Sequence, residues 1–168
     1  MKRIFYTMLV PILALSFAAC SGGGGEDPIT AVRPGMTLEE VLELEPDLIA
    51  SDKDGMLHCK RNFGGAEGWF FVNFYTAESG ELALNVGWDA EPQEDGEKVY
   101  RELLSGLKSC YGKPTDTAET KASDNNPTAV QTAIWKTEVY LGKLTYSENT
   151  DTGACRVLYL SGIERIAD

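Results

Sequence analysis

The residues best suited to chemistry are few, and they are not grouped for it. The chain has a single histidine, His58, followed directly by Cys59. Adjacent residues of an extended strand point to opposite faces, so these two side chains cannot share a metal ion there. One histidine also leaves the Ser/His/Asp and Cys/His nucleophile arrangements with one possible base, and no nucleophile elbow accompanies it. We therefore interpret His58 as structural.

Two short acidic clusters are explained better as turn and surface residues than as sites. The run Asp52 to Gly55 begins like a calcium loop, but its glycine comes two positions early and no glutamate follows at the bidentate position. Glu94 and Asp95 are paired carboxylates, as acid–base catalysis requires, yet they lie in a polar connector without apolar residues to shift a pKa. The sequence therefore predicts no catalytic residue, no metal and no cofactor.

The N-terminus has the layout of a secretory signal peptide. Two basic residues precede an apolar run from Ile4 to Phe17 that is too short to span a bilayer comfortably, and Ala18 and Ala19 follow. A small pair directly before Cys20 resembles the lipobox of bacterial lipoproteins, although Phe17 stands where the family usually has leucine. In that family the signal peptidase cuts before the cysteine, whose thiol carries diacylglycerol. An ordinary secreted protein cut after Ala19 is the alternative.

The lipobox resemblance implies an address at the bacterial cell envelope. Residues 1–19 are then the signal peptide, Cys20 is the lipidated N-terminus, and residues 20–28 form a glycine-rich tether. The anchor would lie in the outer membrane facing the periplasm if the cell is Gram-negative. Residues 29–168 are one domain by size. Removal of two basic residues with the leader takes the formal net charge from -11 to -13. A surface this acidic repels phosphate backbones, which argues against nucleic acid as a partner.

The strongest pattern in the domain lies between Trp69 and Trp88 and predicts a β-hairpin. A three-residue loop over residues 78–80, with Gly80 at positive φ, fixes its register. The predicted pairs are Phe74 with Leu84, Val72 with Val86, Phe70 with Trp88 and, on the other side, Phe71 with Gly87. A four-residue loop would pair Phe74 with Ala83 and split each strand's apolar residues between the two faces, so we reject it.

Other periodicities predict two helices and four further strands. Thr37 and Glu40 form a capping box for a helix from Leu38 to about Glu45, and Pro46 stops it. Apolar residues recur at helical spacing from Glu97 to Tyr111, before Gly112. Strands are expected at 56–61, 129–136, 139–147 and 155–161, and loops at 62–68 and 115–128.

These elements run helix, strand, strand, strand, and then the same again. The predicted fold class is α+β, with an antiparallel sheet of about six strands and two helices on one face. The two halves would be 29–89 and 90–168. The residue match between the two halves is short: Tyr75-Thr76 in the first half corresponds to Tyr146-Ser147 in the second, and an acidic turn follows each pair. Internal duplication and chance similarity of two hairpins both remain open.

Two short segments resemble a family of bacterial lipoproteins. Gly35 to Val41 is similar to the GMT-x-x-E-V entry of the first helix in small outer-membrane lipoproteins of the SmpA/OmlA (BamE) type, and Leu107 to Pro114 has a similar YG-x-P helix exit. Leu44-Glu45-Pro46 lacks the glycine of that pattern. The tandem layout also resembles the β-lactamase inhibitor protein, which grips its partner with an open sheet face. Both resemblances imply a binding or assembly protein and not an enzyme.

The expected function is therefore a membrane-anchored, non-catalytic binding or assembly module with a protein or small-ligand partner. The candidate partner-binding residues are aromatic: Trp69, Phe71, Tyr75, Trp135 and Tyr140. Their coverage by the protein's own helices is the alternative for those residues, and an enzyme that processes envelope polymers with carboxylates is the alternative function. With Cys20 lipidated, one disulfide is possible, and Cys110 with Cys155 is the expected pair because the second helix should cross the strands of its own half.

Overall fold

The computed structural model describes residues 26–51, 55–78, 80–92, 95–138 and 140–163. The predicted signal peptide, Cys20 and most of the tether lie outside these ranges, as do Asp52 to Asp54 and Glu94. The elements in chain order are α1 (Leu38–Leu44), β1 (Ile49–Ala50), β2 (Met56–Phe63), β3 (Ala66–Ala77), β4 (Gly80–Ala90), α2 (Gly96–Tyr111), β5 (Asp116–Thr120), β6 (Thr128–Lys136), β7 (Tyr140–Asn149) and β8 (Cys155–Ile163).

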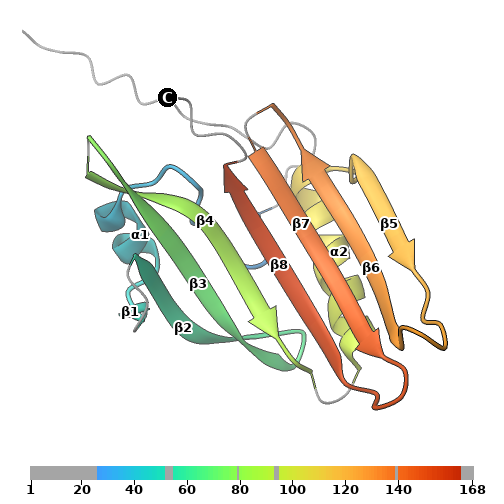
Figure 1. Cartoon of the computed structure of the whole chain (residues 1–168). Helices are drawn as coiled ribbons and strands as arrows, with labels where there is room; N and C mark the ends of the chain where they lie inside the picture. The colour runs from blue at the N-terminus through green and yellow to red at the C-terminus, as the bar shows by residue number, and fades with distance from the viewer. Residues whose placement is uncertain (1–25, 52–54, 79, 93–94, 139, 164–168) are drawn as a thin grey trace, which may run out of the picture.

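The strands form one antiparallel sheet in the order β1-β2-β3-β4-β8-β7-β6-β5. Each helix is followed by four strands, and the two sets of four meet where β4 pairs with β8 at the middle of the sheet (Figure 1). The α+β class is confirmed, but the sheet has eight strands in the described residues, not about six.

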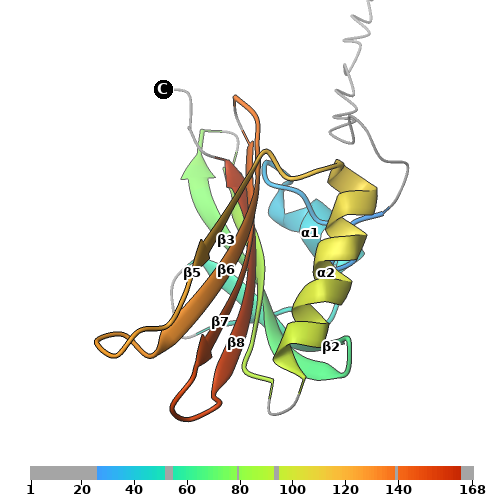
Figure 2. The same ribbon diagram turned by 90° about the vertical axis from the view of Figure 1, so that its right-hand side faces the viewer.

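Both predicted helices are present. The Thr37 Oγ1 accepts from the Glu40 backbone N–H at 3.3 Å, and the Glu40 carboxylate accepts from the Thr37 N–H at 2.8 Å, which completes the capping box. The second helix ends before Gly112, whose φ of 77° suits glycine. Figure 2 shows both helices on the same side of the sheet, so among the described residues one sheet face is covered by helices and the other has no helix on it.

Three segments predicted as loop or left unassigned are strand. The edge strand β5 lies inside the expected loop 115–128, and the two-residue β1 at the other edge was not predicted. The expected loop 62–68 is wrong because β2 runs on to Phe63 and β3 begins at Ala66. Only Gly64 and Gly65 lie between them, with φ of 58° and 83°, the conformation that a tight hairpin turn requires.

The predicted hairpin register is correct from Phe70 to Asn73, away from the turn, and wrong from Phe74 to the turn. Val72 pairs with Val86 and Phe70 with Trp88, as expected. A register shift between Asn73 and Phe74 then pairs Phe74 with Ala83, which is the pairing that the loop argument rejected. The bulge leaves Leu84 of β4 without a partner on β3. The apolar residues on the side of the bulge away from the turn therefore keep their shared face. Gly80 does have positive φ, at 118°.

The core lies between the covered sheet face and the two helices. Its largest fully buried side chains come from both halves of the chain: Trp88, Tyr159, Phe70, Leu103, Leu107 and Leu144. The N-terminal segment of the described chain belongs to the same layer, since Ile29 and Val32 are also buried. Among the described residues, no helix is long and apolar enough to cross a membrane.

Candidate functional site

The sheet face without helices, here called the open face, carries the side chains that alternate with the core residues. On β3 these are Trp69, Phe71, Asn73 and Tyr75, since Phe70 and Val72 between them are fully buried. Cross-strand pairing adds members from the other strands: His58, Lys60, Asp89, Leu158, Leu160, Lys143, Thr145 and Ile134. The three aromatic residues predicted in the first half therefore lie on one surface.

Phe71 lies near the middle of this face. It pairs with Gly87, and a Cβ atom on Gly87 would overlap the Phe71 ring, so the ring lies directly on the glycine backbone. Leu160 is the next residue across the sheet, on β8, followed by Lys143 on β7. An apolar strip thus crosses from the first half to the second.

Trp69, near the edge of the open face, is 44% exposed. Its ring has the Lys60 ammonium 4.2 Å from its centroid and the His58 ring at 5.0 Å, edge-on. Lys60 also binds Glu67, with Nζ and Oε1 2.8 Å apart. His58 is therefore a packing partner of an exposed tryptophan, which agrees with its structural interpretation.

The candidate aromatics of the second half lie on the covered face instead. Trp135 is only 4% exposed and donates from Nε1 to the Gly112 carbonyl oxygen at 2.9 Å. The Tyr140 ring packs 5.9 Å from the ring of Tyr111 on α2. The structure therefore joins Trp69, Phe71 and Tyr75 on one surface and does not bring Trp135 and Tyr140 to it.

The expected disulfide is not formed. Among the described residues, Cys59, Cys110 and Cys155 form no disulfide with one another. Cys110 lies near the C-terminal end of α2, whereas the Cys155 thiol donates to the Pro92 carbonyl, 3.1 Å away, just before the helix begins. The helix length between these ends is about 20 Å, far beyond the reach of a disulfide. The expectation was wrong because the sequence does not show which end of the helix each strand approaches. Burial raises the pKa of the Cys59 and Cys155 thiols.

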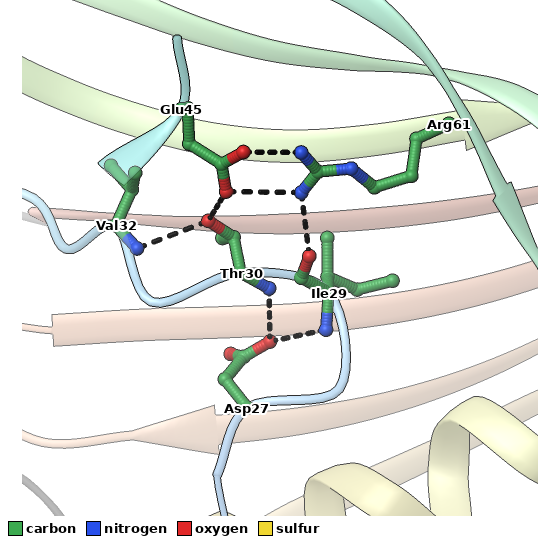
Figure 3. A network of polar contacts seen from close by, with 6 residues as sticks. All are labelled: Asp27, Ile29, Thr30, Val32, Glu45 and Arg61. Atoms are coloured by element: carbon green, nitrogen blue, oxygen red, sulfur yellow. Dashed lines mark hydrogen bonds and ion pairs between the residues drawn. The ribbon is translucent and has the colours of Figure 1, made fainter. Parts of the chain in front are cut away.

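On the covered side, residues 26–33 form a segment that we call the strap, and a polar network holds it (Figure 3). The Arg61 guanidinium forms an ion pair with Glu45 and donates to the Ile29 carbonyl oxygen at 2.8 Å. Glu45 also accepts from the Thr30 hydroxyl at 2.6 Å. Burial alone would lower the pKa of Arg61, but the hydrogen bond and charge of Glu45, with a further contribution from Cys59, raise it overall. The ion pair therefore ties the end of α1, β2 and the strap together.

Asp27 fixes the strap to the other half of the chain. Its Oδ2 accepts from the hydroxyls of Tyr111 at 2.7 Å and Tyr159 at 2.9 Å, while Oδ1 accepts from the Ile29 N–H at 2.8 Å. Burial, with the nearby Asp27 charge, raises the pKa of both tyrosines. Asp27, which the sequence assigns to the tether, is thus bound into the domain.

Sequence reasoning missed this network, although one signal pointed to it. Arg61 follows Leu57 and Cys59 at alternate positions of β2, so it occupies an inward position where an arginine needs a partner. Asp27 gave no such signal beside a run of glycines. Comparisons of the chain with known protein families, with curated proteins and with solved structures find no match.

Proposed function

We propose that the protein is a lipid-anchored, non-catalytic binding module of the bacterial cell envelope, and that its open face receives a protein partner. The observation that supports this most directly is an eight-stranded sheet with one face that no described helix covers, on which Trp69, Phe71 and Tyr75 are all partly exposed. The anchor is the predicted diacylglycerol on Cys20, and the helix-plus-four-strand unit is proposed to have arisen by internal duplication.

The size of the open face suits a protein partner. Eight strands at about 4.8 Å spacing give a width of about 34 Å. The strands range from two residues in β1 to twelve in β3. At an average of about eight residues, or about 26 Å, the area is roughly 900 Å², close to one side of a standard protein interface. Tryptophan and tyrosine are also the residues that most often dominate binding energy at such interfaces.

The charges on the open face favour the same interpretation. Lys60 is paired with Glu67, and Arg156 is paired with Asp89 through two hydrogen bonds of 2.7 and 2.5 Å. The two pairs cancel, and the register adds Lys143, Lys136 and Asp116 to the face, so its net charge is small although the chain as a whole is acidic. A neutral surface with apolar residues at its centre is easier to desolvate than the acidic remainder.

Differential capture tests the proposal. The acylated protein is used as bait in detergent-solubilised envelope, alongside a Phe71→Ala/Tyr75→Ala variant and a Leu42→Ala control on the exposed side of α1. We expect a protein that the wild type and the control retain and the open-face variant loses. Equal capture by all three, or reproducible turnover of an envelope polymer that disappears when one carboxylate is changed, would contradict the proposal.

The anchor is tested separately. Cys20→Ala should lose the acyl mass and should no longer fractionate with membranes. A wild-type mature N-terminus at another residue would show that the proposed address is wrong.

A further inference from the structure

We infer that one end of the open face holds a second binding site, which takes a neutral saccharide chain. This site lies outside the part of the face that contains Phe71 and Tyr75, and it does not depend on the proposed lipid anchor. It is carried by a groove of suitable volume, by the hydrogen-bonding side chains that line the groove, and by an exposed tryptophan in its wall.

The groove consists of two neighbouring hollows at the lower end of the sheet in Figure 1, where β3 and β8 begin and β4 and β7 end. The hollow beside β3 has a volume of about 660 Å³, and the hollow beside β8 has a volume of about 510 Å³. Glu91 and Pro92 line both. Each volume is in the range of ligand-binding pockets. From β3 to β7 the groove crosses about 14 Å of sheet, which suits a short chain of sugar rings better than a single ring.

The hollow beside β8 is lined by uncharged side chains that hydrogen-bond. Ser147 and Asn149 alternate with the buried Tyr146 on β7, so they belong to the open face, and Thr128 lines the same hollow from β6. Hydroxyl and amide groups both donate and accept hydrogen bonds, as the hydroxyls of a sugar do. The described residues that line the two hollows include no leucine, isoleucine, valine or phenylalanine. The lining therefore does not suit an acyl chain or an amphipathic helix, which need a continuous apolar wall.

Most of the charged side chains in the groove are already paired. Lys60 binds Glu67. Arg156 binds Asp89 through two hydrogen bonds, and these bonds, with the charges of Asp89 and Glu91, raise the pKa of Arg156. A charged ligand would have to compete with these pairs. A neutral ligand with many hydroxyls would instead use the lone pairs and N–H groups that the pairs leave over.

Trp69 supplies the large apolar surface of the groove. Its ring is 44% exposed and lines the hollow beside β3. The C–H groups on one face of a sugar ring pack against an aromatic ring, while the sugar hydroxyls reach the polar groups around it. The Lys60 side chain over the Trp69 ring is itself 47% exposed and flexible, so a sugar ring can displace it. One large ring among hydrogen-bonding side chains is thus the arrangement that a saccharide requires.

Titration of the mature full-length protein with neutral tetrasaccharides tests this inference. The probes are cellotetraose, maltotetraose and chitotetraose, and tetragalacturonic acid is the anionic control. The protein is kept in a polyoxyethylene detergent, because a glycoside detergent would compete for the groove. Tryptophan fluorescence reports on the site itself, since Trp88 and Trp135 are buried and Trp69, the third tryptophan of the chain, is exposed. We expect at least one neutral probe to shift the emission to shorter wavelength and the anionic control to leave it unchanged.

Isothermal titration calorimetry of variants separates the groove from the middle of the open face. Trp69→Ala should weaken binding of the neutral probe by roughly tenfold or more, and Asn149→Ala should weaken it several-fold. The matched control is Phe71→Ala/Tyr75→Ala, which should bind the saccharide like the wild type although it loses the proposed protein partner. Failure of all three neutral probes to bind, equal binding by Trp69→Ala, or tighter binding of tetragalacturonic acid would overturn this inference and leave the proposed function as it stands.

Discussion

Phe70 and Phe71 are neighbours on β3, but they lie in opposite environments. Phe70 is fully buried between the sheet and the helix layer, with the Arg61 guanidinium 4.2 Å from its ring. Phe71 lies on the Gly87 backbone at a surface that no described element covers. The comparison shows that the covered face supplies the buried core, and we expect the open face to accept changes without unfolding the domain.

Lys60 and Arg61 show the same contrast for charge. The Arg61 and Glu45 side chains are 24% and 13% exposed, and the pair also holds the strap. The side chains of Lys60 and Glu67, on the open face, are 47% and 66% exposed. Charge on the covered side is thus part of the structure, while charge on the open face sets what the surface attracts.

Replacing one tryptophan on each face should give the largest difference in unfolding free energy between the two faces. Trp135→Ala leaves a large cavity in the covered core and should cost about 3–5 kcal/mol of unfolding free energy. Trp69→Ala removes an exposed ring and its contact with Lys60, worth about 1 kcal/mol or less. Urea unfolding of both variants measures the difference. Similar losses would mean that the two faces do not differ in the way described.

The second-largest difference in unfolding free energy should be between variants of the neighbouring cations Arg61 and Lys60. Arg61→Ala leaves Glu45 partly buried without its partner, which should cost about 2–4 kcal/mol. Lys60→Ala breaks an exposed pair and should change stability by no more than about 0.5 kcal/mol. The same unfolding measurement compares them. A Lys60 effect as large as that of Arg61 would contradict the contrast between the faces.

The tyrosines that bind Asp27 should make the covered side sensitive to alkaline pH. Because the pKa of Tyr111 and Tyr159 is raised in the folded state, their contribution is present below about pH 10 and is lost as the pH rises above that value. Tyr111→Phe should cost about 1 kcal/mol at pH 7 and make the alkaline decline shallower. An unchanged pH profile of unfolding in this variant would argue against the role of the hydroxyl.

A substitution at the tip of the β3–β4 hairpin should cause the smallest loss of unfolding free energy. Gly80→Val places a β-branched side chain at a φ of 118° and should cost about 1 kcal/mol. Glu81→Val, at an exposed strand position with ordinary φ, is the matched control and should be close to neutral. Thermal unfolding of the pair would show whether the backbone of Gly80 is responsible.

The sequence predicted the elements whose residues alternate or recur clearly. Both helices and the six longer strands have apolar residues at the right spacing, and the capping box marks the start of α1. The edge strand β5 was not predicted because all five of its residues are exposed, so the sequence from Asp116 to Thr120 shows no alternation of apolar and polar residues. The bulge near Phe74 was not predicted because Ala83 and Leu84 are both apolar. The hydrophobic pattern therefore allows either residue as the partner of Phe74.

The site was predictable only in part, for a related reason. Alternation on β3 places Trp69, Phe71 and Tyr75 on one face, but only the tertiary structure shows which face the helices cover. Trp135 follows the same kind of pattern on β6 and is nevertheless buried. The strap depends on Asp27 meeting Tyr159, residues that lie at opposite ends of the domain sequence. No local pattern encodes that contact.

The central claim is that neighbouring residues of one sheet serve two separate faces, and Phe70→Ala against Phe71→Ala tests it most directly. We predict a loss of about 3–5 kcal/mol of unfolding free energy for Phe70→Ala and about 1 kcal/mol for Phe71→Ala, measured by urea unfolding at pH 7. Losses of equal size, or a Phe71→Ala variant that fails to fold, would show that Phe71 is part of the core and that the open face is not a free surface.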